Sequence, residues 1–289
     1  IDETGVLLYQ DLDGDEYGDP ATETLVCDGP REGWIGVGGD CDDQNASVNP
    51  LAVEMCDGID NDCDSATTEV GMSSFQSSNA ELQDMTEFFS SEETEPSERG
   101  VVVQTDGDLY FCEGTHYGMI RVDGTKNLSM IGLAGDASKV VLDASLAGTV
   151  VVIEGSGASL SISGMTIQNG SDESGFGGIV LTSEDSEGFA SGGVLELDNV
   201  VIQNNIADLV GGVYASGADV RITDSAILDN IGSLWYGGLV VQDGILDMER
   251  VEISGNTAPY FAGAVYASST VSSVGNWVDV QVKENEGQF

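Results

Sequence analysis

Aspartates recur at every second residue over a short stretch near the amino end. The run is Asp11-x-Asp13-x-Asp15-x-Tyr17-x-Asp19, with glycines at positions 14 and 18. Calcium takes about six to eight oxygen ligands, and this spacing in a loop can turn carboxylates and a backbone carbonyl toward one centre. We therefore expect calcium ligation by the side chains of Asp11, Asp13, Asp15 and Asp19 and by the Tyr17 carbonyl. The loop departs from an EF-hand, because Glu16 stands where glycine is expected and no glutamate occupies the twelfth position.

Two further acidic clusters follow, at residues 40–45 and 57–64. Their candidate metal ligands are Asp40, Asp42, Asp43, Asn45, Asp57, Asp60, Asp62 and Asp64. The alternative is that these aspartates form solvated turns. However, the first 64 residues hold 18 acidic residues and one basic residue, which would repel one another without a counter-ion. Calcium is favoured over zinc because the ligands are hard oxygens and this segment contains no histidine.

Four of the five cysteines, Cys27, Cys41, Cys56 and Cys63, fall in the same acidic segment. A segment with so few hydrophobic residues needs cross-links, so we predict two disulfides formed in an oxidising compartment. We predict the sequential pairing Cys27–Cys41 and Cys56–Cys63, while the spacing leaves the two other connectivities open. The remaining Cys112 is expected to be a buried free thiol.

These motifs resemble a known family. Residues 9–20, 38–43 and 56–64 are similar, closely and in order, to the MopE-type metal-binding repeat of secreted and surface bacterial proteins, over about residues 7–64. The Asp-x-Asp-x-Asp part is also similar to thrombospondin type 3 calcium repeats. The resemblance implies an extracellular or bacterial outer-surface metal-binding module. The copper association in the family name fits poorly, because copper prefers imidazole and sulfur, and the sole histidine, His116, lies outside the module.

Charge and hydropathy exclude several classes of partner. The formal net charge is −43, with 8 Lys plus Arg against 51 Asp plus Glu, so neither nucleic acid nor an anionic membrane surface is an expected partner. No apolar run is long enough to cross a membrane as a helix, so no membrane insertion is expected. The chain opens at Ile1 without methionine, which we interpret as processing.

Composition predicts three regions. Residues 1–64 form the acidic, loop-rich, disulfide-stapled metal-binding module, and residues 65–99 form a linker rich in serine and glutamate. In that linker the sequence Ser78-Asn79-Ala80-Glu81 is a capping box followed by apolar residues at helical spacing, which predicts a short helix. Residues 100–289 are rich in valine, isoleucine, leucine and glycine.

The third region contains internal repeats. The pattern Ile/Val-x-x-Asn ends at Asn205, Asn230, Asn256 and Asn285, and Gly-Gly or Ala-Gly follows the first three of these. Aligned on the repeat, one column reads Ile162, Leu197, Ile222, Met248, Trp277, and a second reads Leu160, Leu195, Val220, Leu246. Residues 128–132 match 160–164 in the same way. A period near 25 with alternating apolar residues predicts a mainly β, right-handed parallel β-helix with asparagines at an inward bend.

The alignment also predicts an outward column, Ser161, Glu196, Arg221 and Asp247, which we interpret as a structural ion ladder. The repeats resemble the Gly-Gly-Ala/Ile and Phe-x-x-Asn repeats of polymorphic outer-membrane proteins over about residues 160–289, with Ile or Val in place of Phe. Residues 110–143 resemble the first coils of pectate-lyase-like β-helices. Both resemblances imply a secreted or surface-displayed β-helix, often used in carbohydrate binding or adhesion.

We therefore expect a calcium-binding structural or adhesive protein of the cell surface and no catalytic activity. The chain stops where the repeat calls for another coil, so we expect self-association into filaments or a longer parent chain. A carbohydrate or a cell-surface protein is a further expected partner, and the aromatic pairs Trp235-Tyr236 and Tyr260-Phe261 are either an exposed platform or packing. A polysaccharide lyase or hydrolase is the first alternative, with candidates Asp198, Arg221, Glu249 and Arg250. Metal scavenging is the second.

Overall fold

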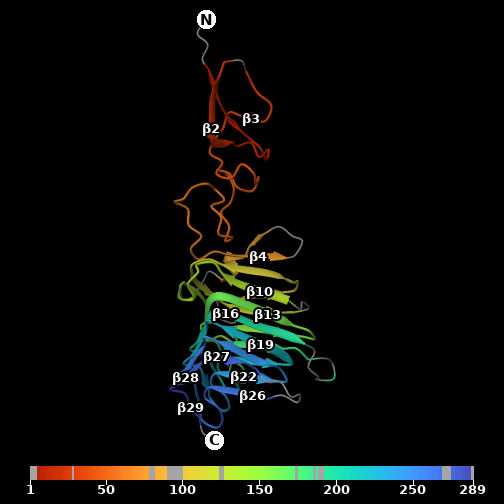
Figure 1. Cartoon of the computed structure of the whole chain (residues 1–289), viewed down its shortest axis with the longest axis vertical. Coiled ribbons are helices and arrows are strands. Elements are labelled where there is room, and N and C mark those ends of the chain that lie inside the picture. Colours follow the sequence, from red (N-terminus) through yellow and green to blue (C-terminus); the bar gives the residue numbers. More distant parts are fainter. Residues whose placement is uncertain are drawn as a thin grey trace. The chain divides into compact units, whose positions relative to one another are not determined.

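The chain divides into two compact units, Ile1–Glu69 and Val70–Phe289. This division comes from a computed structural model. It describes residues 5–27, 29–77, 82–89, 100–123, 127–172, 175–184, 187, 192–268 and 275–287. Each unit is considered by itself (Figure 1).

The first unit contains a small antiparallel sheet as well as loops. Its strands are β1 (Val6–Gln10), β2 (Asp19–Val26) and β3 (Trp34–Ile35), in the order β2-β1-β3. Residues 36–69 run as turns and bends with no further strand or helix. The loop-rich module expected from the sequence therefore also has a hairpin, whose connecting loop carries the first aspartate run.

The second unit is mainly β and is built of parallel sheets, as the repeat predicts. The largest sheet has 14 strands: β4 (Ser73–Ser77), β5 (Gln83–Asp84), β7 (Gly107–Phe111), β8 (Gly114–Tyr117), β10 (Asn127–Gly132), β11 (Val140–Asp143), β13 (Ser159–Gln168), β16 (Gly193–Gln203), β19 (Ala218–Thr223), β20 (Ala226–Leu228), β23 (Leu246–Glu249), β24 (Glu252–Ser254), β27 (Trp277–Val278) and β28 (Gln281–Lys283).

Two smaller parallel sheets complete this unit. One has seven strands: β6 (Gly100–Val103), β9 (Met119–Val122), β12 (Val151–Glu154), β15 (Ile179–Thr182), β18 (Val213–Ser216), β22 (Leu239–Gln242) and β26 (Val265–Ser268). The other has five: β14 (Ser171–Asp172), β17 (Ile206–Ala207), β21 (Ile231–Gly232), β25 (Thr257–Ala258) and β29 (Glu286–Gly287). From β13 onward the chain visits the large, the five-stranded and the seven-stranded sheet in turn.

The register derived from the repeats is confirmed. Leu195 pairs with Leu160 on one side and Val220 on the other, and Val220 pairs with Leu246. The column that begins at Ile162 pairs in the same way through to Trp277. Figure 1 shows β10, β13, β16 and β19 side by side in this order. Stacking of this kind puts like side chains from successive repeats into one row.

Inward-facing rows from the large and the seven-stranded sheet meet in one hydrophobic core. Leu160, Ile162 and Leu195 come from the first of these sheets, and Ile153 and Val213 from the second; each is at most 1% exposed. Residues between them along the strands point outward, so burial follows the two-residue period of the sequence.

Asparagines form a buried ladder at the bend after the large sheet. Asn205, Asn230 and Asn256 are each 0% exposed. The Nδ2 of Asn230 donates to Oδ1 of Asn256 at 2.9 Å and to the carbonyl of Ile202 at 2.9 Å. Its Oδ1 accepts from the backbone N and the Nδ2 of Asn205. The predicted inward bend is confirmed, and the amide suits it because it both donates and accepts.

Close packing explains the glycine pair that follows each asparagine. A Cβ on Gly212 would lie 2.3 Å from the carbonyl oxygen of Gly238 in the next repeat. No side chain fits there without a backbone shift, so the glycines serve close stacking of turns.

Part of the expected linker belongs to the second unit. Strand β4 pairs antiparallel with β7 and with β5. The helix α1 spans Thr86–Phe89 and buries Phe89, and a 3₁₀ helix, η2, spans Ala137–Lys139. Because Gln83–Asp84 is a strand, the helix is shorter than the apolar spacing indicates, and the capping box at 78–81 lies outside the described residues.

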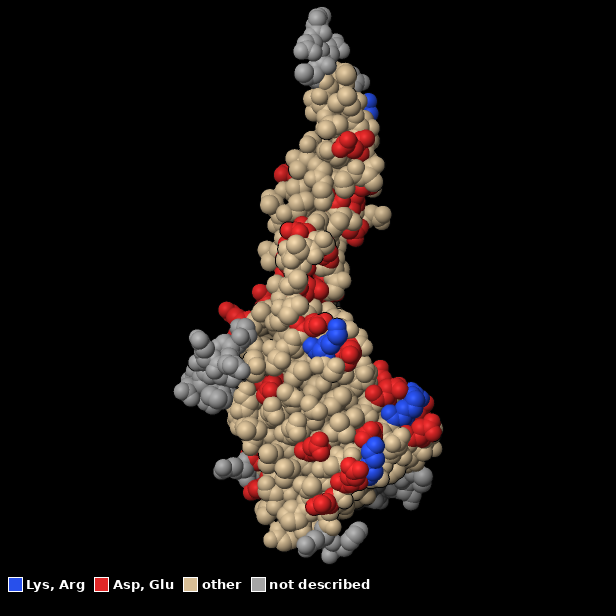
Figure 2. Space-filling view, turned by 90° about the vertical axis from the view of Figure 1, so that its left-hand side faces the viewer, with Lys and Arg blue, Asp and Glu red and all other residues tan. Residues whose placement is uncertain are grey.

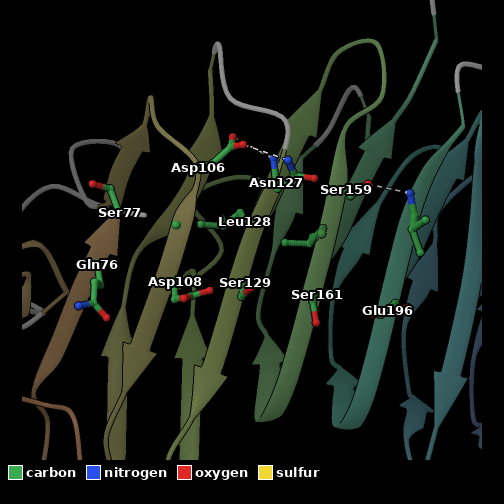
Figure 3. Close-up of a pocket in the computed structure, with 13 residues that line it drawn as sticks. Gln76, Ser77, Asp106, Asp108, Asn127, Leu128, Ser129, Ser159, Ser161 and Glu196 are labelled. Atoms are coloured by element: carbon green, nitrogen blue, oxygen red, sulfur yellow. Dashed lines mark hydrogen bonds between the residues drawn. The ribbon is translucent and has the colours of Figure 1, made fainter. Parts of the chain in front are cut away.

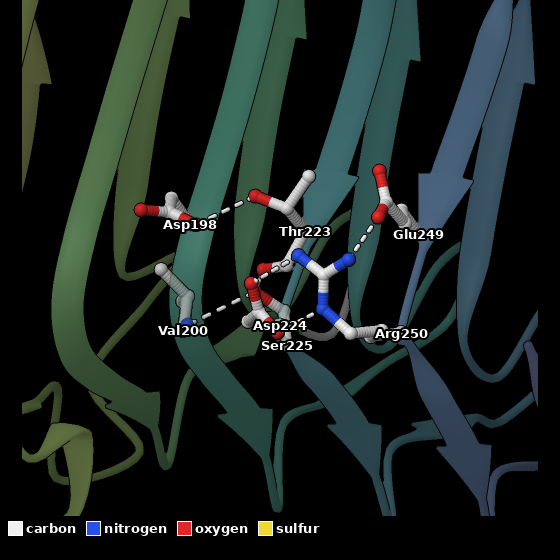
Figure 4. A network of polar contacts seen from close by, with 7 residues as sticks. All are labelled: Asp198, Val200, Thr223, Asp224, Ser225, Glu249 and Arg250. Carbon is white, nitrogen blue, oxygen red and sulfur yellow. Dashed lines mark hydrogen bonds and ion pairs between the residues drawn. The ribbon is translucent and has the colours of Figure 1, made fainter. Parts of the chain in front are cut away.

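In the outward column, the described residues form one of the expected ion pairs. Arg221 stands between Glu196 and Asp247 in the register, and its Nη1 lies 2.8 Å from Oε1 of Glu196. Arg250 binds Asp224 and Glu249, while Asp198 accepts a hydrogen bond from Thr223 (Figure 4). Basic side chains on the face of the second unit shown in Figure 2 also adjoin acidic ones.

The aromatic pairs divide between packing and exposure. Trp235 stacks on Phe261 with ring centroids 4.7 Å apart, and Tyr236 contacts Tyr266. Tyr260 nevertheless remains 62% exposed. In the described part of the chain no helix has the length and apolarity to span a membrane.

We expect Asn230→Ala to destabilise the second unit by about 2–4 kcal/mol, because it leaves the Ile202 carbonyl and the Asn205 amide buried without partners. Urea unfolding followed by circular dichroism measures this change. Ser233→Ala, at an exposed position in the next turn, between β21 and β22, is the control and should be neutral. Equal stability of the two variants would contradict the ladder's role.

The buried side chain of His116 should make the stability of the second unit sensitive to acid. Its side chain is 0% exposed, Nε2 lies 2.9 Å from the Cys112 carbonyl, and Nδ1 has no partner among the described atoms. Burial lowers the pKa of His116 below its ordinary 6.5. The unfolded chain therefore binds the proton first, and stability should fall as the pH drops below about 6.5.

The protein has one histidine, so its imidazole proton signals can be followed without assignment. We expect their titration midpoint in the folded protein to lie below 6.5, because burial lowers the pKa of His116. His116→Phe should flatten the stability profile between pH 6.5 and 5. A titration midpoint at or above 6.5 would rule this prediction out.

Candidate metal centre

The first aspartate run folds into a loop held by its own side chains. Gly14 N donates to Oδ1 of Asp11 at 2.7 Å, and Tyr17 N donates to Oδ1 of Asp15 at 2.8 Å. Such turns form because an aspartate can accept from an amide two or three residues later. They leave the second carboxylate oxygens of Asp13 and Asp15 without a hydrogen-bond partner among the residues that the structure describes.

The loop around Gly38 is bonded to this first loop. Gly39 N and Asp40 N both donate to the Gly18 carbonyl, and Leu12 N donates to Oδ1 of Asp43 at 2.8 Å. Gly18 is required here, because a Cβ would lie 2.6 Å from the Gln10 carbonyl oxygen. Two segments about 30 residues apart in the chain are thereby brought against each other.

This contact gathers two groups of acids that share Asp13. The first is Asp11, Asp13 and Asp15, and the second is Asp13, Asp40 and Asp43. Within each group, one oxygen per residue lies within 4.8 Å of the others. After small movements, several carboxylate oxygens could therefore lie about 2.3–2.6 Å from one cation, which is the usual distance between calcium and its oxygen ligands.

The electrostatics of this cluster require neutralisation. Asp40 is 1% exposed, and the Oδ2 atoms of Asp13, Asp15 and Asp40 are buried with no hydrogen-bond partner within the described part of the chain. Burial, together with the neighbouring carboxylates, raises the pKa of both Asp13 and Asp40. A buried anion is costly unless it is paired or bound to a metal, so a cation would stabilise this arrangement.

A third acidic group lies further along the first unit. It consists of Glu54, Asp60 and Asp62. Glu54 was not among the expected ligands, and it is 8% exposed. Its carboxylate accepts from the amides of Asn61 and Asp62, and burial raises its pKa. Its isolation from the Asp-x-Asp runs hid it from sequence reasoning; a lone glutamate two residues before a cysteine is a weak signal.

Other expected ligands lie outside these carboxylate groups. Asp19, Asn45 and Asp64 each accept from the amide two residues later, as in ordinary Asx turns. Asp57 accepts from the amide of Ile59, and Asp42 is exposed. The carbonyl of Tyr17 as a ligand stays a prediction.

The predicted disulfide pairing is wrong. Cys41 pairs with Cys63, with a Cα–Cα distance of 5.7 Å. Cys27 is a free, exposed cysteine, and Cys56 and Cys112 are disulfide-bonded. Cys112 is therefore not the free thiol expected. Spacing favoured near neighbours, whereas the fold turns residues 41 and 63 toward each other across 22 residues.

The disulfide adjoins the second and the third acidic group, since Asp40 precedes Cys41 and Asp62 precedes Cys63. The backbone N of Cys41 also donates to the Cys63 sulfur at 3.1 Å. This link holds the segment that carries Asp40 and Asp43.

Part of this module is similar to a known family. A family model for MopE, whose name refers to copper binding and whose description is a putative metal-binding motif, matches residues 40–69. The matched range includes Asp40, Asp43 and the Glu54 group. No curated protein and no solved structure matches the chain. The similarity supports metal binding and leaves the metal's identity open.

We expect the paired substitution Cys41→Ser with Cys63→Ser to weaken metal binding at least tenfold, because it releases the segment that carries Asp40. Isothermal titration with calcium at neutral pH measures the affinity. Cys27→Ser is the matched control and should bind like the wild type. An unchanged affinity in the double variant would show that the disulfide does not position the ligands.

Proposed function

We propose that the first unit is a calcium-binding module whose ion lies among Asp11, Asp13, Asp15, Asp40 and Asp43. The observation that carries this proposal is the set of three buried, unpartnered carboxylate oxygens on Asp13, Asp15 and Asp40. The ion would bind the first loop to the loop around Gly38 and neutralise a part of the chain that holds 18 acids. Metal binding would thus be structural, completing a unit with little core of its own.

The donor atoms favour calcium over copper or zinc. Every carboxylate group in the described part of this unit is made of aspartate and glutamate oxygens, with no imidazole. Cys41 and Cys63 are joined in a disulfide, so their thiolates are not ligands. Hard oxygen donors from flexible loops suit calcium, whereas copper and zinc prefer nitrogen and sulfur.

We further propose that the three parallel sheets of the second unit close into a right-handed β-helix that serves as a rigid carrier. The cyclic order of the sheets, their common core and the asparagine ladder support this proposal. A disulfide-bonded, metal-binding module on such a carrier fits an extracellular or cell-surface structural or adhesive protein, because disulfides persist in oxidising compartments. Head-to-tail filaments are less favoured, because β4 and β5 run antiparallel at one edge of the large sheet.

The site can be tested with Asp40→Asn and its matched control Asp42→Asn. Both remove one negative charge and keep the side-chain shape, but Asp40 lies in the buried cluster and Asp42 is exposed. We expect Asp40→Asn to lower calcium affinity at least tenfold and Asp42→Asn to change it less than threefold. Calcium at 100 times its Kd should stabilise the wild type by about 2.7 kcal/mol and Asp40→Asn much less.

Titration calorimetry and thermal unfolding in calcium and in EGTA provide the two readouts. Magnesium, zinc and copper are titrated in parallel, and bound metal is measured by elemental analysis of protein purified without chelator. Tighter copper than calcium binding would replace the calcium assignment. Identical melting with and without EGTA would refute a structural role for the ion.

A further inference from the structure

A polar groove crosses the outer face of the large sheet in the second unit. Its volume is about 690 Å³, and strands β4, β7, β10, β13 and β16 contribute to it. Gln76, Asp108, Ser129, Ser161 and Glu196 form one row along it (Figure 3). Successive members of this row are partners in the strand register. A concave site of this size falls in the range typical of ligand-binding pockets.

The two sides of the groove are held in place. Asp106 accepts from the backbone N of Asn127 at 3.1 Å and from its Nδ2 at 3.0 Å. At the other end, Glu196 is paired with Arg221, which lies outside the groove. The small Ser129 and Ser161 form the floor between larger polar side chains. A groove whose walls are fixed in advance loses little entropy on binding.

The spacing of the row indicates the shape of the ligand. Neighbouring strands lie about 4.8 Å apart, so the five side chains repeat at that interval along the groove. This step is close to the length of one pyranose unit in an extended β-linked chain. An extended polysaccharide would therefore present one sugar to each strand, and the hydroxyl, amide and carboxylate groups can hydrogen-bond sugar hydroxyls.

We propose that this groove binds a neutral, unbranched polysaccharide of β-linked pyranose units. Acidic polysaccharides fit poorly, because the lining formed by the described residues contains carboxylates and no lysine or arginine. Like charges facing each other across an interface oppose association. This site lies in the second unit and is independent of the proposed calcium module.

The separation of the carboxylates favours binding without cleavage. Three strand steps of about 4.8 Å put the Asp108 and Glu196 positions roughly 14 Å apart. Asp106, which also lines the groove, lies two residues from Asp108, about 7 Å along an extended chain, but both of its carboxylate oxygens already accept hydrogen bonds from Asn127. Glycoside hydrolysis by two carboxylates needs a separation of about 5–9.5 Å. Since Glu196 is also engaged by Arg221, the pair would hold sugars rather than break their linkages.

The test uses the full chain and soluble β-1,4-linked glucose, xylose and N-acetylglucosamine hexasaccharides as probes. We expect saturable binding of at least one probe by titration calorimetry, with no shortened products by chromatography. Ser161→Arg, which fills the groove floor, should weaken that binding at least tenfold. Ser163→Arg is the control, because Ser163 lies two residues away on the same face of β13 and does not line the groove.

Circular dichroism establishes whether both arginine variants fold. If Ser161→Arg does not fold, Ser161→Ala replaces it as the smaller change at the same position. EGTA should leave the binding unchanged, so loss of the calcium site and loss of the groove are separable results. The proposal is overturned if no probe binds with a Kd below about 5 mM, which corresponds to a binding free energy of about −3 kcal/mol. Equal weakening by the two arginine variants, or tighter binding of oligogalacturonate, would also overturn it.

Discussion

Repulsion between confined carboxylates is the constraint on which the amino-terminal unit depends. Asp13 and Asp40 come from different loops, yet the hydrogen bonds around Gly18 hold those loops together and bury oxygens of both residues. A fold that concentrates negative charge in this way needs a compensating cation or proton, and the raised pKa of Asp40 expresses the same need. The small sheet, the Asx turns and the disulfide all serve to maintain this one cluster.

The second unit solves a different problem, which is to build a long core from short strands. It does so by repetition, since each repeat supplies the same inward rows to the one before it. The bend is polar but fully bonded, because each asparagine amide joins its neighbours and the backbone. Freed from packing, the outward rows carry charge pairs around Arg221 and Arg250 and a polar groove around Ser129 and Ser161.

The two units place different demands on folding. The module has little apolar core and relies on cross-links and, in our proposal, on an ion. The second unit buries residues such as Ile162 and Leu197 almost completely, so packing supplies most of its stability. In our proposal, removal of the ion should therefore affect mainly the first unit, because that unit holds the ligands and has the smaller core.

The sequence by itself determined the strand register, the buried asparagines and the oxygen-rich chemistry of the module. The register and the asparagine positions were predictable because aligning the repeats with one another shows which residues occupy equivalent positions. The partner of Leu195, for example, is the equivalent residue of the next repeat. The tertiary structure alone decided that Asp40 meets Asp13, that Cys41 meets Cys63 and that Glu54 joins an acidic group. Non-repeating loops carry no internal register, so which of their residues meet depends on how the backbone folds in three dimensions.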